Sequence, residues 1–274
     1  MADKSDWQGK TGETWAQEWR RTDRSLSHLT EQLLAKTRGF ACGHVLDIGC
    51  GAGELSLAIA RGRSDATVKG IDVSPRLIEV ARERGERHTN LSFALADAAE
   101  WQSDAEFAPE LLVSRHGVMF FDDPPGAFAN LANQSAEGAG LLFSCFRKRD
   151  ENPVFTEVLR LLPEPAQPVD PLAPGPFAFA DPERVMAILT AGGWGQIAIT
   201  PIDFPMIVGT GEDPVDDAFA YFSRIGPAAK AAAELDAVSR ERFLDRLRTL
   251  AERYLHGNLV VLPAAAWIVT ARKV

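Results

Sequence analysis

The sequence predicts an α/β protein, a three-layer sandwich in which helices cover both faces of a mostly parallel sheet. Short apolar runs alternate with helical segments between residues 45 and 144, and a glycine-rich turn follows the first run. Each helix carries the chain back to the start of the next strand, so that neighbouring strands run in the same direction. This alternation is typical of a parallel sheet with helices on both faces.

The expected strands and helices follow one another along the chain. Strands are expected at 45–48, 67–72, 91–95, 110–114, 140–144, 197–203 and 264–271. Helices are expected at 54–61, from Pro75 onward, at about 125–135 and from 181 to 192. Pro75 suits the first position of its helix, because the N–H that proline lacks has no helical partner there.

Three segments lie outside this rhythm. Residues 1–40 are expected to form an N-terminal helical cap on a domain that covers 41–274, with helices at 12–21 and 23–37. Trp15 and Trp19 are four residues apart, as are Leu29 and Leu33, so that each pair shares a helical face. Residues 151–182 are expected to form a proline-rich loop, and residues 210–257 a helical insertion before the last strand.

The composition limits the possible partners. The chain has 274 residues and a net charge of -9, and its basic runs are too short for the patch that binds nucleic acid, so we expect a small-molecule substrate. No apolar run reaches the ~18 residues of a membrane span, and the N-terminus lacks an apolar signal core. Three cysteines without paired spacing favour a reducing cytoplasm, and the scattered histidines predict no metal site. The oligomeric state is left open.

The turn after the first strand carries Gly49, Gly51 and Gly53 in the segment VLDIGCGAGE. Bare backbone at such a turn allows a ligand to approach closely. The spacing differs from the G-x-G-x-x-G of dinucleotide-binding proteins, which would require a glycine in place of Glu54. Asp47, inside the strand, suits a cationic ligand better than an anionic one.

Two further acids follow the next two strands. Asp72 ends the second strand, where a carboxylate accepts hydrogen bonds from ribose hydroxyls. Asp97 follows the third strand, where it suits an adenine amino group and leaves the N–H of Ala98 for a ring nitrogen. These positions lie at the carboxyl ends of adjacent strands, where open α/β sheets bind ligands. The alternative interpretations are a helix cap for Asp72 and a solvated loop acid for Asp97.

The segments VLDIGCGAG, GIDVSP, ADAAEW and LLVSRHGVMFF resemble the class I S-adenosylmethionine-dependent methyltransferases, a Rossmann-like family. Within it, the likeness is to the small-molecule branch, near the ubiquinone/menaquinone C-methyltransferase type. The resemblance implies S-adenosyl-L-methionine as cofactor, S-adenosyl-L-homocysteine as product, and the sheet order 3-2-1-4-5-7-6 with strand seven antiparallel. The positions that it assigns to the cofactor are Asp47, Gly49, Cys50, Gly51, Gly53, Asp72, Val73, Asp97, Ala98, Ser114 and Arg115.

His116 is the candidate catalytic residue. It follows the fourth strand, where a neutral imidazole could take a proton from the methyl acceptor. The alternatives are a ring that packs beside the cofactor or contacts the substrate. Cys50 is interpreted as a small filler and not as a nucleophile, since no base lies near it in the sequence.

The N-terminal segment is interpreted as a lid. Trp7, Trp15 and Trp19 could close over the cofactor, and Arg20 or Arg24 could hold a substrate carboxylate. The alternative is a helix that packs on the edge of the sheet with solvated arginines.

The expected function is in-line transfer of a methyl group from S-adenosylmethionine to a small molecule. Two rival hypotheses stay open, a protein that binds the cofactor without turnover and a nicotinamide-dependent oxidoreductase. The substrate, the atom that is methylated and the use of a general base are not determined by the sequence.

Overall fold

The computed structural model describes residues 4–40, 42–104, 106–164 and 170–274. Its central sheet contains β1 (His44–Ile48), β2 (Thr67–Asp72), β3 (Leu91–Leu95), β4 (Leu111–Arg115), β5 (Gly140–Phe146), β6 (Trp194–Gly209), β7 (Leu255–His256) and β8 (Leu259–Lys273). Along the sheet the order is β3-β2-β1-β4-β5-β8-β6, and β7 pairs with the end of β8.

The strand directions confirm the expected mostly parallel sheet. The pairs β1–β2, β2–β3, β1–β4 and β4–β5 are parallel, whereas β8 runs antiparallel to both β5 and β6. Without the short β7, β8 is the seventh strand in chain order. The strand order and the antiparallel direction of this strand therefore agree with what the resemblance implied. The order reverses between β1 and β4, and sheets of this kind bind ligands at the carboxyl ends of the strands beside that reversal.

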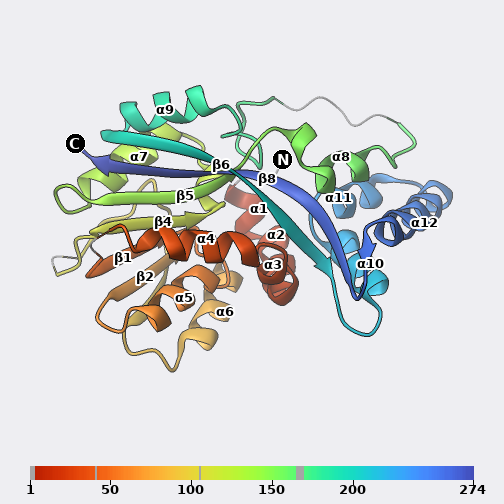
Figure 1. Cartoon of the computed structure of the whole chain (residues 1–274), viewed down its shortest axis with the longest axis horizontal. Helices are drawn as coiled ribbons and strands as arrows, with labels where there is room; N and C mark the ends of the chain where they lie inside the picture. The colour runs from red at the N-terminus through yellow and green to blue at the C-terminus, as the bar shows by residue number, and fades with distance from the viewer. Residues whose placement is uncertain (1–3, 41, 105, 165–169) are drawn as a thin grey trace.

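Helices cover the two faces of the sheet (Figure 1). On one face pack α4 (Ser27–Thr37), α5 (Glu54–Gly62) and α6 (Pro75–Gly85), and on the other pack α7 (Pro124–Asn133) and α9 (Pro182–Ala191). Right-handed crossovers require this division, because the chain moves in one direction along the sheet from β1 to β3 and in the opposite direction from β4. The faces are sealed by fully buried side chains such as Phe128, Phe143 and Trp194.

The N-terminal segment differs from the expected pair of helices. It forms α1 (Lys4–Gln8), α2 (Lys10–Gln17), α3 (Trp19–Ser25) and α4. The helix expected at 12–21 was wrong, because the chain breaks at Glu18, which leaves the helical conformation and caps two helices at once. The break lets Glu18, only 4 % exposed, form ion pairs with Arg21 and with Arg224, which is distant in sequence.

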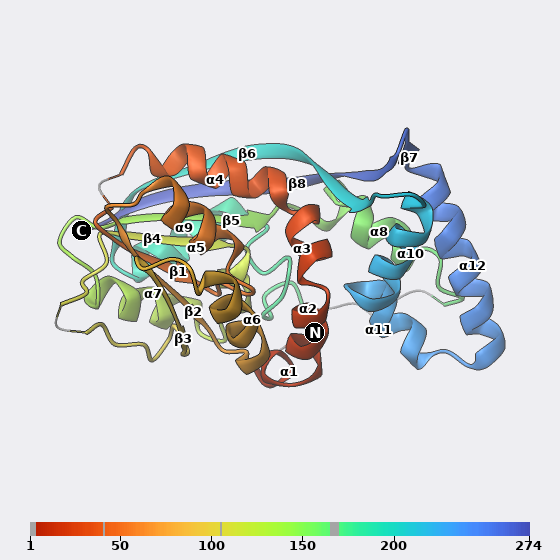
Figure 2. The same ribbon diagram turned by 90° about the horizontal axis from the view of Figure 1, so that it is seen from below.

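The last two long strands extend past the rest of the sheet, as Figures 1 and 2 show. Beyond β6 the chain forms α10 (Pro214–Arg224), α11 (Pro227–Glu234) and α12 (Ala237–Arg253). The strand expected at 197–203 is longer at both ends and includes Pro201 and Pro205. Proline is tolerated there because β6 is an edge strand, which has a neighbouring strand on one side only. On the other side, the N–H that proline lacks would have no strand to bond to.

The proline-rich segment is not irregular throughout. The short 3-10 helix η2 (Arg149–Glu151) leads into it, and α8 (Pro153–Leu159) occupies a part that was expected to be loop. A second 3-10 helix, η1 (Gly117–Phe120), follows β4. Pro153 stands at the first position of α8, where proline starts a helix and does not break it. Pro165 and Pro168 lie outside the described residues. Among the described helices, none combines the length and apolarity needed to cross a bilayer.

Candidate active site

The turn between β1 and α5 is built on glycines in the left-handed region. Gly49, Gly51 and Gly53 have φ values of 62°, 55° and 85°. A Cβ on Gly49 would lie 2.8 Å from the Cα of Gly117, so two turns of the chain approach each other here. A Cβ on Gly51 would meet nothing within 4 Å, and Gly51 lines a cavity. The turn therefore presents bare backbone to that cavity, as the sequence predicted.

Asp72 organises the same turn from the end of β2. Its Oδ2 accepts a hydrogen bond from the Gly51 N–H at 2.9 Å, and its Oδ1 accepts one from the Ser74 N–H at 2.9 Å. The cap of α6 is Ser74, whose hydroxyl accepts from the Leu77 N–H. Burial raises the pKa of Asp72, while the backbone donors at Ser74 and Gly51 oppose that shift. A carboxylate oxygen has two lone pairs, so both oxygens keep the capacity to accept from a ligand.

Asp97 and Ala98 line the cavity beyond β3. Asp97 accepts a hydrogen bond from the Ala99 N–H at 2.9 Å, and its other oxygen forms a 2.5 Å ion pair with Lys4 of α1. This pair places the N-terminal helix across the end of the site. Val73 lines the cavity between Asp72 and α6.

One large cavity connects these groups. Its volume is about 480 Å³, and it extends from the carboxyl ends of β1, β2, β3 and β4 to α8, α10 and α11. Trp7 and Trp15 also line it, with their rings edge to face at a centroid distance of 5.2 Å. The cavity thus lies between the sheet, the N-terminal helices and the helices of the segment after β6.

Asp47 is the most unusual carboxyl group of the cavity. It is 1 % exposed, its Oδ2 accepts a hydrogen bond from the Ser56 hydroxyl at 2.6 Å, and its Oδ1 is buried without a hydrogen-bond partner. Burial raises the pKa of Asp47 to about 7, although Ser56 and the Arg115 charge act against the shift. An orphaned buried acceptor that lines a cavity fits a ligand with a donor, best a cationic one such as an ammonium group.

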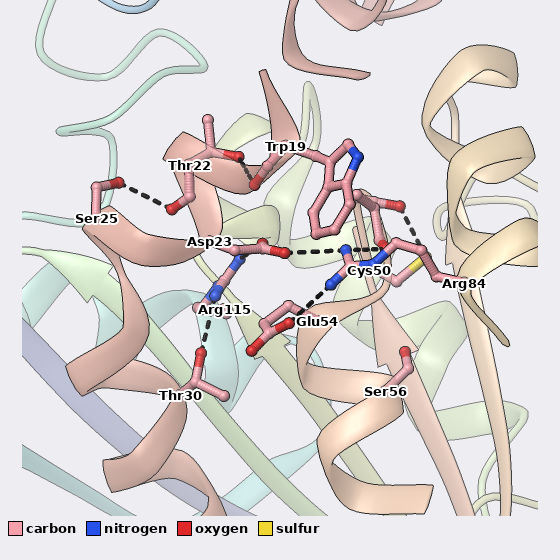
Figure 3. Close-up of polar contacts among 12 residues, drawn as sticks. Trp19, Thr22, Asp23, Ser25, Thr30, Cys50, Glu54, Ser56, Arg84 and Arg115 are labelled. Carbon is pink, nitrogen blue, oxygen red and sulfur yellow. Dashed lines mark hydrogen bonds and ion pairs between the residues drawn. The ribbon is translucent and has the colours of Figure 1, made fainter. Parts of the chain in front are cut away.

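Arg115 is held by the N-terminal helices and is not a free cation. Its guanidinium donates to Asp23 at 2.9 Å and to the Thr30 hydroxyl at 2.8 Å. Asp23 also pairs with Arg84 of α6 at 2.9 Å, and Figure 3 shows Asp23 between the two guanidinium groups. Arg84 pairs in turn with Glu54, the residue that follows the glycine turn. The network ties α3 to both α6 and the end of β4.

His116 lines the cavity from a left-handed position, with φ of 68°, directly after β4. Its Nδ1 lies 2.7 Å from the Ser144 hydroxyl, and its ring packs against Phe146 with centroids 4.2 Å apart. Nε2 is buried and has no hydrogen-bond partner. Burial, helped by the neighbouring Arg115 charge, lowers the pKa of His116 to about 3, so the imidazole is neutral.

Two of the residues assigned to the cofactor stand behind the cavity wall, since Gly53 and Ser114 are not among its lining residues. The Ser114 hydroxyl donates to the Ile48 carbonyl at 2.7 Å and accepts from the Gly117 N–H at 3.1 Å, so it joins the turns after β1 and β4. Cys50 lines the cavity, but burial raises the pKa of its thiol well above the ordinary value. A thiol of that kind is a packing group and not a nucleophile.

Several lining residues were not foreseen from the sequence. In the sequence, Asp23 resembles any polar residue of an amphipathic helix. Only its contacts with the distant Arg84 and Arg115 identify it as part of the site. Met206, Tyr221 and Phe222 line the cavity from β6 and α10, where their spacing predicts ordinary core residues. Arg24, a candidate for holding a carboxylate, is instead paired with Asp217 at 2.7 Å and donates to the carbonyls of β6.

The sheet order, the glycine turn and the acids at the carboxyl ends of β1, β2 and β3 have the arrangement that the resemblance to class I S-adenosylmethionine-dependent methyltransferases implied. Residues 45–138 match the family described as "Methyltransferase domain", and they include the turn and all three acids. A trans-aconitate 2-methyltransferase of Methylobacterium radiotolerans is 37% identical over 110 residues, which are 40% of this chain and 40% of that protein. The chain thus matches less than half the length of this curated relative.

Solved structures agree on the fold over a larger part of the chain. A phosphoethanolamine N-methyltransferase 2 of Haemonchus contortus, in complex with S-adenosyl-L-methionine, has a TM-score of 0.57 at 15% identity, covering 100% of this chain and 60% of that one. The [4+2]-cyclase SpnF has a TM-score of 0.50 at 20% identity, covering 90% and 80%. Since one neighbour is described as a cyclase, the fold alone does not determine the reaction.

Proposed function

We propose that this protein transfers the methyl group of S-adenosylmethionine to a small-molecule acceptor that binds in the same cavity. The observation that carries the proposal is the convergence of Asp47, Asp72 and Asp97 with the glycine turn on one cavity at the carboxyl edge of the sheet. The cofactor has an ammonium group, a ribose and an adenine, and the site offers acceptors in that order along three strands.

The residues present fit this cofactor. Asp47, with its unpartnered Oδ1, would hold the ammonium group beside the backbone of Gly49 and Gly51. Asp72 would accept from the ribose hydroxyls, and Asp97 with the N–H of Ala98 would contact the adenine. Such charge-assisted hydrogen bonds are each worth about 1.5–3 kcal/mol, enough to give micromolar affinity together with ring burial.

When bound, the cofactor supplies a methyl group that its sulfonium charge already activates. The remaining work falls to the protein, which has to align the acceptor and exclude water. Trp7 and Trp15 cover the cavity, and His116 borders it with a neutral imidazole. The N-terminal helices thus act as the lid in this proposal, and His116 contacts the acceptor.

A location in the cytoplasm and the lack of a nucleic-acid partner stay predictions. They are supported by the net charge of -9 and by the three cysteines, all buried and unpaired.

Mass spectrometry with methyl-deuterated S-adenosylmethionine tests the reaction. Incubated with a panel of phenols, amines and carboxylic acids, the protein should produce S-adenosylhomocysteine together with an acceptor that carries CD₃ in place of hydrogen. Wild-type protein that binds the cofactor, yet forms neither product with any acceptor, would favour a binding protein without turnover.

A further inference from the structure

The cavity has a second half away from the glycine turn, which we call the acceptor chamber. Its walls come from the end of β5, from α8, from β6 and from α10. Apolar side chains form these walls, among them Phe146, Val154, Phe155, Met206, Phe222 and Ile225. Several are almost fully buried, so these walls are part of the core.

Few polar atoms face the acceptor chamber. His116 borders it, since its ring packs on Phe146, and its Nε2 has no hydrogen-bond partner. Tyr221 contributes a hydroxyl that lies 3.4 Å from the Ser25 hydroxyl of the lid. A buried imidazole nitrogen without a partner is a position for one hydroxyl or amine group of a ligand.

No cation is available to neutralise an anionic acceptor. Among the described residues that line the whole cavity, the only positively charged ones are Lys4 and Arg115, and both are already paired, with Asp97 and with Asp23. Seven acidic residues line the cavity. A carboxylate or phosphate would lose its hydration here without gaining a counter-charge, which is costly in an apolar site.

We propose that the methyl acceptor is a small, uncharged and mainly apolar molecule of ring type, held by the aromatic walls and by one hydrogen bond to His116. The proposal rests on the proposed methyl transfer and names the substrate class of that site. Since one cavity of about 480 Å³ holds both cofactor and acceptor, the acceptor is small. A polycarboxylate such as trans-aconitate does not suit this chamber.

A matched pair of probes tests the charge preference. 2-Naphthol and 6-hydroxy-2-naphthoate share the two rings and the hydroxyl group and differ by one carboxylate. Calorimetry on the full chain, first saturated with S-adenosylhomocysteine at neutral pH, should show 2-naphthol binding at least tenfold more tightly. Equal or tighter binding of 6-hydroxy-2-naphthoate would overturn the proposal, as would binding of neither probe.

The titration with S-adenosylhomocysteine distinguishes a failure of the proposed function from a failure of the proposed substrate class. No heat with S-adenosylhomocysteine would contradict the proposed function, whereas normal binding of it followed by the wrong probe preference contradicts only the substrate class. The wild-type comparison alone decides the proposal, whether or not any variant folds.

Two variants at one position add a control. The Phe155 ring lines the chamber and contacts Phe146 at a centroid distance of 5.3 Å. Phe155→Arg supplies the missing cation, so it should weaken 2-naphthol and strengthen 6-hydroxy-2-naphthoate, each by at least tenfold. Phe155→Leu keeps the chamber uncharged and should preserve the wild-type order. The same order in Phe155→Arg, with S-adenosylhomocysteine binding intact, would contradict the charge argument.

Discussion

Single residues of the site carry shifted pKa values that make stability depend on pH. The Asp47 carboxyl has a pKa of about 7 in the fold, because burial disfavours its charged form, against ~3.9 in an unfolded chain. Between these values the folded protein keeps a proton that the unfolded chain has lost. The contribution of Asp47 is therefore fully favourable below the unfolded pKa and is lost as pH rises through 7.

Asp47→Asn should remove this pH dependence, since the amide has a similar shape and no charge. Relative to the wild type, the free energy of unfolding of the cofactor-free variant should rise by up to about 4 kcal/mol from pH 4 to pH 8. Urea denaturation of both proteins across that range measures the difference. His116, whose folded pKa is about 3, destabilises the fold as pH falls below ~6.5. It does so in both proteins and cancels. Parallel pH profiles would contradict the account of Asp47.

One substitution distinguishes two chemical roles of His116, a hydrogen bond to the methyl acceptor and general base catalysis. A base with a pKa of about 3 accepts a proton only at high cost, so we expect a hydrogen bond to the acceptor and not general base catalysis. One such bond contributes about 1 kcal/mol, and His116→Phe should therefore lower turnover by less than tenfold. The measurement is the pH profile of kcat for both proteins with an acceptor from the panel. A loss of roughly 10²–10⁴ that shrinks at high pH would instead identify His116 as the base.

At the scale of elements, the N-terminal helices depend on a close approach of the chain at Gly12. A Cβ on Gly12 of α2 would lie 2.1 Å from the Trp7 carbonyl oxygen of α1 and 2.2 Å from the Ser74 hydroxyl before α6, so only glycine permits this approach. The contact brings α2 down onto the cofactor side of the cavity, where Trp7 and Trp15 form part of the wall. Arg84 of α6 also contacts the N-terminal helices, because its guanidinium carbon lies 3.8 Å from the centroid of the Trp19 ring of α3.

Gly12→Leu should displace α2 and open the lid while the sheet stays folded. We expect the affinity for S-adenosylhomocysteine to fall at least tenfold, with cooperative thermal unfolding retained. Gly9→Ala is the matched control in the same segment, since its Cβ would meet the Ser5 carbonyl at an ordinary 3.4 Å. Unchanged affinity in Gly12→Leu would contradict the lid, and loss of all cooperative unfolding would show that these helices are part of the core.

The elements that could be predicted are those with local signals. The strands at 67–72 and 91–95 have the expected bounds, because short apolar runs end at turn residues. The break at Glu18 could not be foreseen, since the ion pair that accompanies it joins Glu18 to Arg224, more than two hundred residues away. The helix α8 was not predicted because the prolines of this segment were interpreted as helix-breaking residues, although Pro153 begins the helix.

For the whole molecule, the half of the cavity around the glycine turn could be predicted from the sequence, and the acceptor chamber could not. Gly51, Asp72 and Asp97 lie in short motifs whose residues follow strand ends, so the sheet itself brings them together. The acceptor chamber gathers Phe146, Met206 and Phe222 from separate elements, and an apolar residue has the same sequence pattern whether it faces a cavity or a core. Tertiary packing, and no local rule, makes that distinction.

The most direct test of the central claim is calorimetric titration of the wild-type protein with S-adenosylhomocysteine, with NAD in parallel. We predict micromolar binding of S-adenosylhomocysteine, roughly -7 to -8 kcal/mol, and no heat with NAD. Asp72→Ala removes the acceptor for the ribose and should weaken binding at least tenfold. Heat with NAD and none with S-adenosylhomocysteine would contradict the account, and an unchanged affinity in Asp72→Ala would show that the ribose does not lie at β2.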